Sequence, residues 1–170
     1  MPQTLRLILG DQLNAQHSWF ETVNDDVLYV MMEVRQETDY VQHHIQKVVA
    51  FFAAMRAFAS ERQAEGHQFI YLSLDDQQNL QDITQNLDRI IEEYEIKRFE
   101  YQLPDEYRLD QQMEAYASHL KITTSIADTE HFLTKRDDLK EIFKGKKTYL
   151  MESFYRKMRK KYGIMMETED

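Results

Sequence analysis

The sequence predicts an α/β domain in which a five-stranded parallel sheet carries helices on both faces, followed by a basic C-terminal helix. The main observation is that short apolar runs alternate with longer amphipathic segments through most of the chain. This order is typical of parallel sheets with crossover helices. The second observation is size: 170 residues, 42% of them hydrophobic, suffice for one core of ordinary dimensions.

The strands are expected at short runs of aliphatic, aromatic or β-branched residues bounded by turn-forming residues. The first run ends at Gly10 and Asp11, where glycine allows a sharp turn. The second run follows the turn-like sequence Asn-Asp-Asp. The five expected strands cover residues 5–9, 27–32, 69–72, 98–103 and 121–126.

The helices are expected where apolar residues recur at spacings of three and four. For the first helix, Asp39 is the expected N-cap and Gly66 lies just past the end. The expected helices cover residues 40–64, 80–94, 106–120, 139–144 and 151–162. The alternation predicts a Rossmann-like or flavodoxin-like fold, whose ligands bind beyond the carboxyl ends of the strands.

Composition excludes several classes of site. The absence of cysteine excludes disulfides, thiolate zinc or iron–sulfur sites and a cysteine nucleophile within this chain. The four glycines lie too far apart for a Walker A loop or a G-x-G-x-x-G motif. No apolar run reaches the roughly 20 residues of a membrane span, and the N-terminus is unlike a signal peptide. The cytoplasm is therefore the expected compartment, with no membrane partner.

Charge is distributed unevenly along the chain. The net charge is −9, yet residues 135–161 contain eleven Lys or Arg against four Asp or Glu. We expect residues 1–134 to form the α/β body and residues 135–170 a basic helical segment. That segment suits a nucleic-acid arm, a solvated helix face or a surface that docks on another domain. Its stripe of Phe154, Met158 and Tyr162 favours docking, and we expect the chain to dimerise through it.

Polar residues follow the first two expected strands at their carboxyl ends. Asp11 is placed to accept hydrogen bonds from a ribityl hydroxyl or a heterocyclic N–H, or else to cap the turn. Glu33 and Glu37 suit hydrogen bonding to polyol hydroxyls, acid–base work or simple solvation. His43 and His44 point about 100° apart on a helix, so they are poorly placed to share a metal. We expect neither a catalytic residue nor a metal ligand.

Three segments together resemble one protein family. They are the opening strand and turn at residues 7–13, the E-x3-E-x2-Y-V-x-H-H sequence at 33–44, and the M-E-x-F-Y-R-x-M-R sequence at 151–159. In these segments the chain resembles the deoxyribodipyrimidine photolyase-related proteins, the iron–sulfur bacterial cryptochromes and (6-4) photolyases. The resemblance covers essentially the whole chain.

The resemblance implies more than the residues alone. Family members are longer, with an N-terminal α/β antenna domain that holds 6,7-dimethyl-8-ribityllumazine. A helical domain with FAD and a cysteine-ligated [4Fe–4S] cluster follows. By this resemblance the chain is the antenna domain with the start of a linker, non-catalytic alone, from a DNA photolyase-like lyase or a blue-light receptor. Its partner is its own C-terminal FAD domain, and DNA is contacted through that domain only.

The resemblance also implies the residues of the antenna site. The first-strand turn faces the chromophore, Glu37 is a partner for the lumazine or its ribityl chain, and Met32 and Phe51 lie around the ring. The implied site consists of Gly10, Asp11, Leu13, Met32, Glu33, Glu37, Tyr40, His44 and Phe51. Two alternatives remain: a chromophore-free structural or docking domain, favoured by the bulk of Met32 and Phe51, and a small enzyme using Asp11, Glu33 or Glu37.

Overall fold

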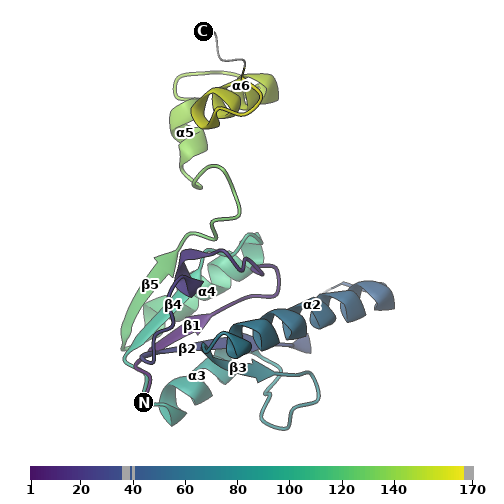
Figure 1. The fold of residues 1–170 in the computed structure, drawn as a ribbon, viewed down its shortest axis with the longest axis vertical. Coiled ribbons are helices and arrows are strands. Elements are labelled where there is room, and N and C mark those ends of the chain that lie inside the picture. The colour runs from purple at the N-terminus through teal and green to yellow at the C-terminus, as the bar shows by residue number, and fades with distance from the viewer. Residues whose placement is uncertain (36–38, 40, 167–170) are drawn as a thin grey trace. The chain divides into compact units, whose positions relative to one another are not determined.

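The computed structural model describes residues 1–35, 39 and 41–166 (Figure 1). The chain divides into two compact units, which we call unit 1 (Met1–Thr129) and unit 2 (Glu130–Asp170). Each unit is described by itself below. In the part of the chain that the structure describes, no helix combines the length and apolar character needed to cross a bilayer.

Unit 1 is built on a five-stranded sheet in which every pair of neighbouring strands is parallel, as predicted. The strand order is β3-β2-β1-β4-β5. The chain therefore adds β2 and β3 on one side of β1 and then returns to add β4 and β5 on the other side of β1. This is the Rossmann order and not the flavodoxin order, which the sequence left open. The strands are β1 (Thr4–Leu7), β2 (Val27–Met32), β3 (Gln68–Leu72), β4 (Arg98–Gln102) and β5 (Thr123–Ala127).

Helices cover both faces of this sheet, also as predicted (Figure 1). Helix α2 (Ile45–Ala64) and the short 3-10 helix η1 (Ser18–Phe20) pack on one face. Helices α3 (Ile83–Glu93) and α4 (Tyr107–His119) pack on the other. The sheet therefore lies between two apolar layers, and its strands need apolar side chains on both sides.

Strand β2 illustrates how the sequence produces this core. All six of its residues are buried. Because successive side chains of a strand point to opposite faces, Leu28, Val30 and Met32 join the α3–α4 layer. The alternate residues Val27, Tyr29 and Met31 join the α2 layer.

Several predicted boundaries were wrong. Helix α2 begins at Ile45 and not near residue 40, because His44 and not Asp39 is its N-cap: the His44 ring accepts a hydrogen bond from the Gln46 backbone N–H at 3.2 Å. Strand β1 ends at Leu7, since a turn closes where the Gln12 N–H donates to the Leu9 carbonyl. The remaining boundaries differ by a few residues at most, and η1 was not predicted.

Unit 2 contains helices α5 (Asp138–Ile142) and α6 (Met151–Tyr162). The predicted bounds of α6 are confirmed, and Gly163 ends it with a φ of 63°. Met158, expected on an outward docking stripe, is only 7% exposed. Tyr162, which belongs to the same expected stripe, is exposed, as are Met151 and Tyr155.

Candidate functional site

A small crevice lies where β1 and β2 reach their carboxyl ends, the edge of the sheet at which such folds bind ligands. Strand β1 contributes Leu7 and the residues that follow it, and β2 contributes Met32. The N-terminal half of α2 closes one side. The crevice is lined by Leu7, Ile8, Leu9, Gly10, Met32, Val34, Phe51, Phe52, Met55 and Ile83, and its volume is about 20 Å³. That is room for about one water molecule.

Phe51 lies in the crevice wall next to Gly10. A Cβ atom built on Gly10 would lie 2.5 Å from Cζ of Phe51 and 2.9 Å from the sulfur of Met55. The aromatic ring therefore lies directly against the Gly10 backbone, an approach that only glycine permits. Phe51 is itself partly buried against the α2 layer of the core.

Glu33 lies just beyond β2, and its side chain is completely buried. Nε and Nη2 of Arg56 on α2 donate to its two carboxylate oxygens at 2.6 and 2.8 Å. The hydroxyl of Tyr71 on β3 donates at 2.6 Å, and the backbone N–H of Leu74 at 2.8 Å. The carboxylate thus ties β2, β3 and α2 together and uses four donors in doing so.

The electrostatics of this cluster favour the ionised carboxylate. Burial by itself raises the pKa of Glu33, but the hydrogen bonds from Arg56, Tyr71 and Leu74 outweigh it and hold the pKa below its ordinary value. Burial and the adjacent Glu33 raise the pKa of the Tyr71 hydroxyl. Glu33 therefore stays charged at neutral pH and stabilises the fold. This role differs from the two that the sequence suggested, acid–base catalysis and hydrogen bonding to a polyol.

Two buried glutamines lie at the carboxyl ends of β1 and β4. The Gln12 amide bridges these strands: its oxygen accepts from the Leu9 N–H at 3.0 Å, and its nitrogen donates to the carbonyls of Gln102 and Leu103 at 3.3 and 3.4 Å. The Gln102 side chain is equally buried, yet neither of its amide atoms has a hydrogen-bond partner among the residues that the structure describes. Gln12 thus lies at the topological switch point of the sheet, between β1 and β4, where the strand order reverses.

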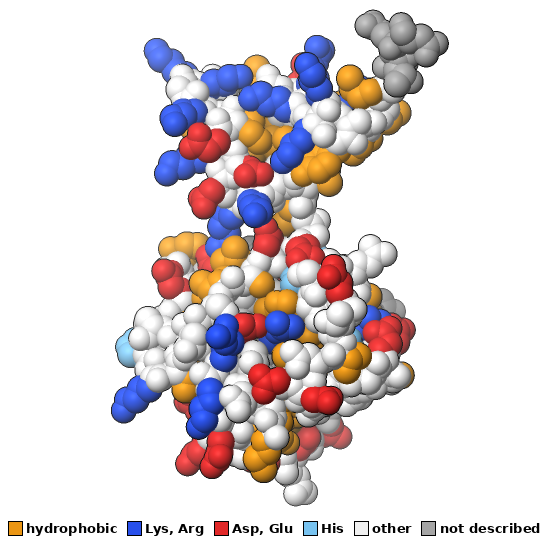
Figure 2. Space-filling model, turned by 60° about the vertical axis from the view of Figure 1, so that its left-hand side comes forward, with side chains coloured by type: hydrophobic (Ala, Val, Ile, Leu, Met, Phe, Trp, Pro, Cys, Tyr) orange, Lys and Arg blue, Asp and Glu red, His pale blue; other side chains and the backbone are white. Residues whose placement is uncertain are grey.

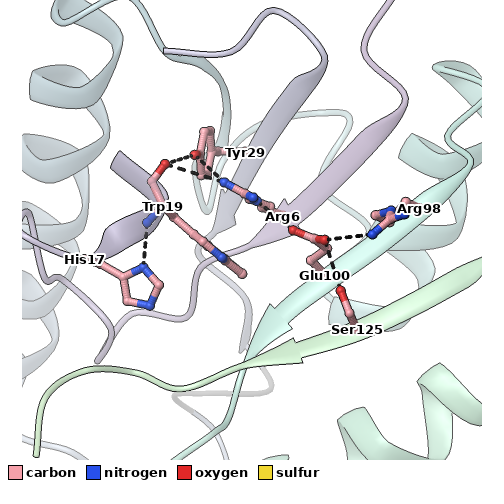
Figure 3. A network of polar contacts seen from close by, with 7 residues as sticks. All are labelled: Arg6, His17, Trp19, Tyr29, Arg98, Glu100 and Ser125. Atoms are coloured by element: carbon pink, nitrogen blue, oxygen red, sulfur yellow. Dashed lines mark hydrogen bonds and ion pairs between the residues drawn. The ribbon is translucent and has the colours of Figure 1, made fainter. Parts of the chain in front are cut away.

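A second polar network crosses the α2 face of the sheet (Figure 3). Arg6 lies between Tyr29 and Glu100, donating to them at 3.0 and 2.8 Å. The Tyr29 hydroxyl donates in turn to the Trp19 carbonyl at 2.5 Å, and Arg6 lies over the Trp19 ring at 4.7 Å from its centroid. Ser125 donates to the other oxygen of Glu100 at 3.0 Å. The network attaches the η1 segment to the middle of the sheet and serves the fold.

Of the other predicted site residues that the structure describes, only Met32 lines the crevice. Met32 is buried in the crevice wall, and Leu13 packs partly buried on the α2 layer. Asp11 is exposed in the turn after β1, and His44 is exposed as the N-cap of α2. Glu37 and Tyr40 lie outside the described residues.

No metal site emerges from the described part of the chain, where no three His, Asp or Glu side chains cluster suitably. His44 caps α2, and the His43 ring lies 3.2 Å from Nζ of Lys47 one turn later. Both histidines thus make contacts within or next to one helix.

Sequence reasoning missed the partners of Glu33 and both glutamines. Arg56 lies 23 residues after Glu33 in the sequence, and Tyr71 lies 38 residues after Glu33. No local spacing therefore links Glu33 to either partner. The signal available was topological: an Arg on the first crossover helix and a Tyr on the third strand both lie beside the end of the second strand. For Gln12 the available signal was its position two residues after Gly10, in the turn that follows the first strand.

The fold and site define a Rossmann-like α/β domain with a small apolar crevice at the carboxyl ends of β1 and β2. The family model described as deoxyribodipyrimidine photo-lyase-related protein matches residues 6–170, and the chain belongs to this family. It is 35% identical over 167 residues to the (6-4) photolyase of Agrobacterium fabrum (strain C58 / ATCC 33970). The match covers 97% of this chain and 33% of that relative, so the chain spans about a third of the relative's length.

Proposed function

We propose that this chain works as the non-catalytic N-terminal domain of a photolyase-like protein, with Phe51 in the place where an antenna chromophore would lie. In this role unit 1 is a structural and docking domain that holds no light-harvesting pigment. The contact between Phe51 and Gly10, with a remaining volume of about 20 Å³, is the observation that supports it best.

The antenna chromophore of the family does not fit the described residues as they lie. Pockets that enclose ligands of this size have volumes of roughly 300 Å³ or more. Phe51 and Met55 both lie within 3 Å of a Cβ position on Gly10, so a flat ring cannot reach the Gly10 backbone while they stay there. Glu33, one candidate for the ribityl hydroxyls, already accepts four hydrogen bonds.

A second candidate function is antenna binding of 6,7-dimethyl-8-ribityllumazine after Phe51 rotates away. The lining of the crevice favours it, because apolar walls and a glycine at the end of β1 present a flat surface that already accepts one aromatic ring. Phe51 is only partly buried. The similarity to a (6-4) photolyase is consistent with this function.

A titration with 6,7-dimethyl-8-ribityllumazine, followed by fluorescence anisotropy, separates the two functions. The structural domain predicts no binding by the wild-type chain, and binding that is gained by Phe51→Ala but not by Phe51→Leu would show that the ring closes the crevice. Phe132→Ala, which changes an exposed ring of unit 2, serves as the matched control. Tight binding by the wild-type chain would instead overturn the structural role and support the antenna function.

The rest of the proposal concerns the longer protein. The [4Fe–4S] cluster would be held by segments corresponding to the other two thirds of the relative, since this chain contains no cysteine. FAD would be held in the same part. The lyase or light-sensing activity, and contact with DNA, would belong to that part as well. Expression of the domain with its C-terminal neighbour, followed by an absorption spectrum of bound FAD and a repair assay on (6-4) photoproduct DNA, tests this assignment.

A further inference from the structure

Unit 1 contains an unusual polar group in its interior. The face of this unit that Figure 2 shows is mainly polar, with hydrophobic side chains in small separate groups. Inside, at the carboxyl end of β4, Gln102 is only 1% exposed. Neither its amide oxygen nor its amide nitrogen has a hydrogen-bond partner among the described residues. Burying an amide without a partner costs free energy, and such groups are rare in folded proteins.

The Gln102 side chain points to the face of the sheet that carries α2 and η1. Phe99 and Tyr101 of the same strand pack in the α3–α4 layer, and successive side chains of a strand alternate between the two faces. Glu100, two residues earlier, accordingly joins the polar network that attaches η1 to the sheet (Figure 3). The register of the sheet pairs Gln102 with Ala127 of β5, which packs in the α2 layer. The unpartnered amide therefore lies next to an apolar layer.

A short segment crosses this end of the sheet. It consists of residues 11–16, and we call it the strap. The Gln12 amide donates to two backbone carbonyls at the end of β4, and Leu13 packs on the α2 layer. Just past the strap, the His17 ring lies 2.8 Å from the carbonyl oxygen of Asp128, directly after β5. The strap therefore crosses the carboxyl ends of β4 and β5 on the face to which the unpartnered amide points.

Several of the hydrogen bonds that hold the strap are long, and its apolar contact is small. Gln12 donates to the β4 carbonyls at 3.3 and 3.4 Å, and Arg62 of α2 donates to the Ala15 carbonyl at 3.5 Å. These distances exceed the usual range of roughly 2.7–3.2 Å. Ala15 and Gln16 are exposed, and Leu13 is only partly buried. Weak hydrogen bonds and few buried apolar contacts are typical of segments that open locally.

Hydrogen bonds within the strap are shorter than those that hold it down. The Asn14 N–H donates to the Gln12 carbonyl at 2.9 Å, and the Gln16 N–H donates to the Asn14 side chain at 3.0 Å. These bonds persist when the strap moves as one piece. The Leu9 N–H, by contrast, donates to the Gln12 side chain at 3.0 Å, so it loses its partner when the strap moves away. Leu9 thus has a backbone donor whose hydrogen bond depends on the strap.

We propose that the strap is a gate, which moves away from the carboxyl ends of β4 and β5 while the rest of unit 1 stays folded. Opening exposes the Gln102 amide to water, whereas closing buries it without a partner. This one side chain therefore shifts the equilibrium toward the open form. The gated edge includes the switch point between β1 and β4, where ligands of this fold class bind, so the strap controls access to it. The inference is independent of whether the crevice between β1 and β2 holds a chromophore.

Hydrogen exchange of the full chain, resolved by residue with NMR, tests the opening. The matched reporters are two neighbouring N–H groups: that of Leu9 donates to the strap, and that of Ile8 donates to the Val30 carbonyl of β2 at 3.0 Å. After correction for intrinsic rates, we expect the Leu9 N–H to exchange roughly tenfold faster or more. Equal corrected rates would mean that the strap opens only when unit 1 unfolds, and would overturn the proposal.

Two substitutions at position 102 separate the effect of the amide from that of its size. Gln102→Met removes the polar group at similar length and should slow exchange of the Leu9 N–H roughly tenfold. Gln102→Asn keeps an amide and should leave the exchange rate close to that of the wild type. Gln85→Met, at an exposed position of α3, is the control and should change nothing. Equal slowing by Met and Asn at position 102, or no slowing by either, would refute the role of the amide.

Thiol labelling gives an independent measure, because the chain contains no cysteine of its own. Gln102→Cys places a single thiol at the gated edge, and Val30→Cys places one at a fully buried position of β2. Urea denaturation identifies the conditions under which both variants are folded. There we expect a small disulfide reagent to label the Gln102→Cys variant roughly tenfold faster or more than the Val30→Cys variant. Equal labelling rates would contradict a gate that opens by itself.

Discussion

The ring of Phe51 lies against the backbone of Gly10, closer than any other residue type at position 10 would allow. This contact joins the end of the central strand to the first half of α2. It also leaves the crevice at the sheet edge with a volume of about 20 Å³. The contact between Phe51 and Gly10 therefore affects both how α2 packs against the end of β1 and how much volume the crevice has.

Gly10→Ala should destabilise unit 1 by about 1–3 kcal/mol, because the added methyl group would overlap Phe51 and Met55. In the Phe51→Ala background the added cost should fall by about 1 kcal/mol or more, since one of the two obstructing side chains is gone. Urea denaturation of the wild type, both single variants and the double variant measures this coupling. Additive costs would show that the two residues do not interact.

Arg56→Ala should destabilise the protein by about 2–3 kcal/mol, because the buried carboxylate of Glu33 loses two of its four donors. Arg89→Ala is the matched control, because it breaks an ion pair with Glu93 whose N–O distance is similar. Ion pairs of this i,i+4 kind stabilise other helices by about 0.5 kcal/mol or less. Equal losses of stability in the two variants, measured by chemical denaturation, would contradict the role of Glu33.

Glu33 should also make stability depend on acid. Its pKa is lower in the folded state than its ordinary value of 4.5, so the stabilisation is fully present above that pH and is lost as the pH falls below it. In Glu33→Gln the free energy of unfolding should be lower at neutral pH and fall less steeply in acid. Denaturant midpoints at a series of pH values provide the measurement, and parallel curves for both proteins would refute the prediction.

The two buried glutamines should respond oppositely to the same substitution. Gln12→Met should cost about 1–3 kcal/mol, because the Leu9 N–H and two carbonyls lose a buried partner. Gln102→Met should be neutral or stabilise by up to about 1 kcal/mol, since the lost amide atoms make no hydrogen bond to any described residue. Thermal unfolding of the two variants compares them directly, and a large loss in Gln102→Met would show that its amide has a partner.

His67 is expected to lower stability as the pH falls below its ordinary pKa of 6.5. Burial lowers the pKa of this ring in the folded state, so protonation favours the unfolded chain. The ring packs edge-on against Phe20 and Tyr29. His67→Gln should flatten the curve of unfolding free energy against pH between about pH 5 and pH 7. Denaturant midpoints at a series of pH values provide the measurement, and a curve as steep as that of the wild type would contradict the prediction.

Much of the fold was predictable because the segments are locally consistent. The apolar run 27–32 predicts β2 with the bounds that the structure shows, and the apolar stripe of 151–162 predicts α6. The order of the strands was not predictable, because strands and helices alternate in the same way in Rossmann and flavodoxin folds. The start of α2 was mispredicted because an apolar spacing continues before Ile45, while the cap is a histidine side chain.

The candidate site was predictable only in part. That Gly10 and Met32 line one crevice follows from parallel strands whose carboxyl ends share an edge, whereas the place of Phe51, on α2, was implied only by the resemblance to the family. The role of Glu33 did not follow, because its partners lie on elements distant in sequence. Glu37 and Tyr40 remain predicted chromophore residues outside the described residues.

The strand order has a consequence for synthesis on the ribosome. Strand β1 is the central strand of the finished sheet and pairs with both β2 and β4. However, β4 is translated about seventy residues after β2. At roughly 5–20 residues per second, the interval lasts on the order of several seconds. During that interval β1 is an open edge with unpaired backbone groups, the kind of edge to which other chains add strands. The innermost strand of the mature domain is therefore the one most vulnerable to mispairing while the chain is being made.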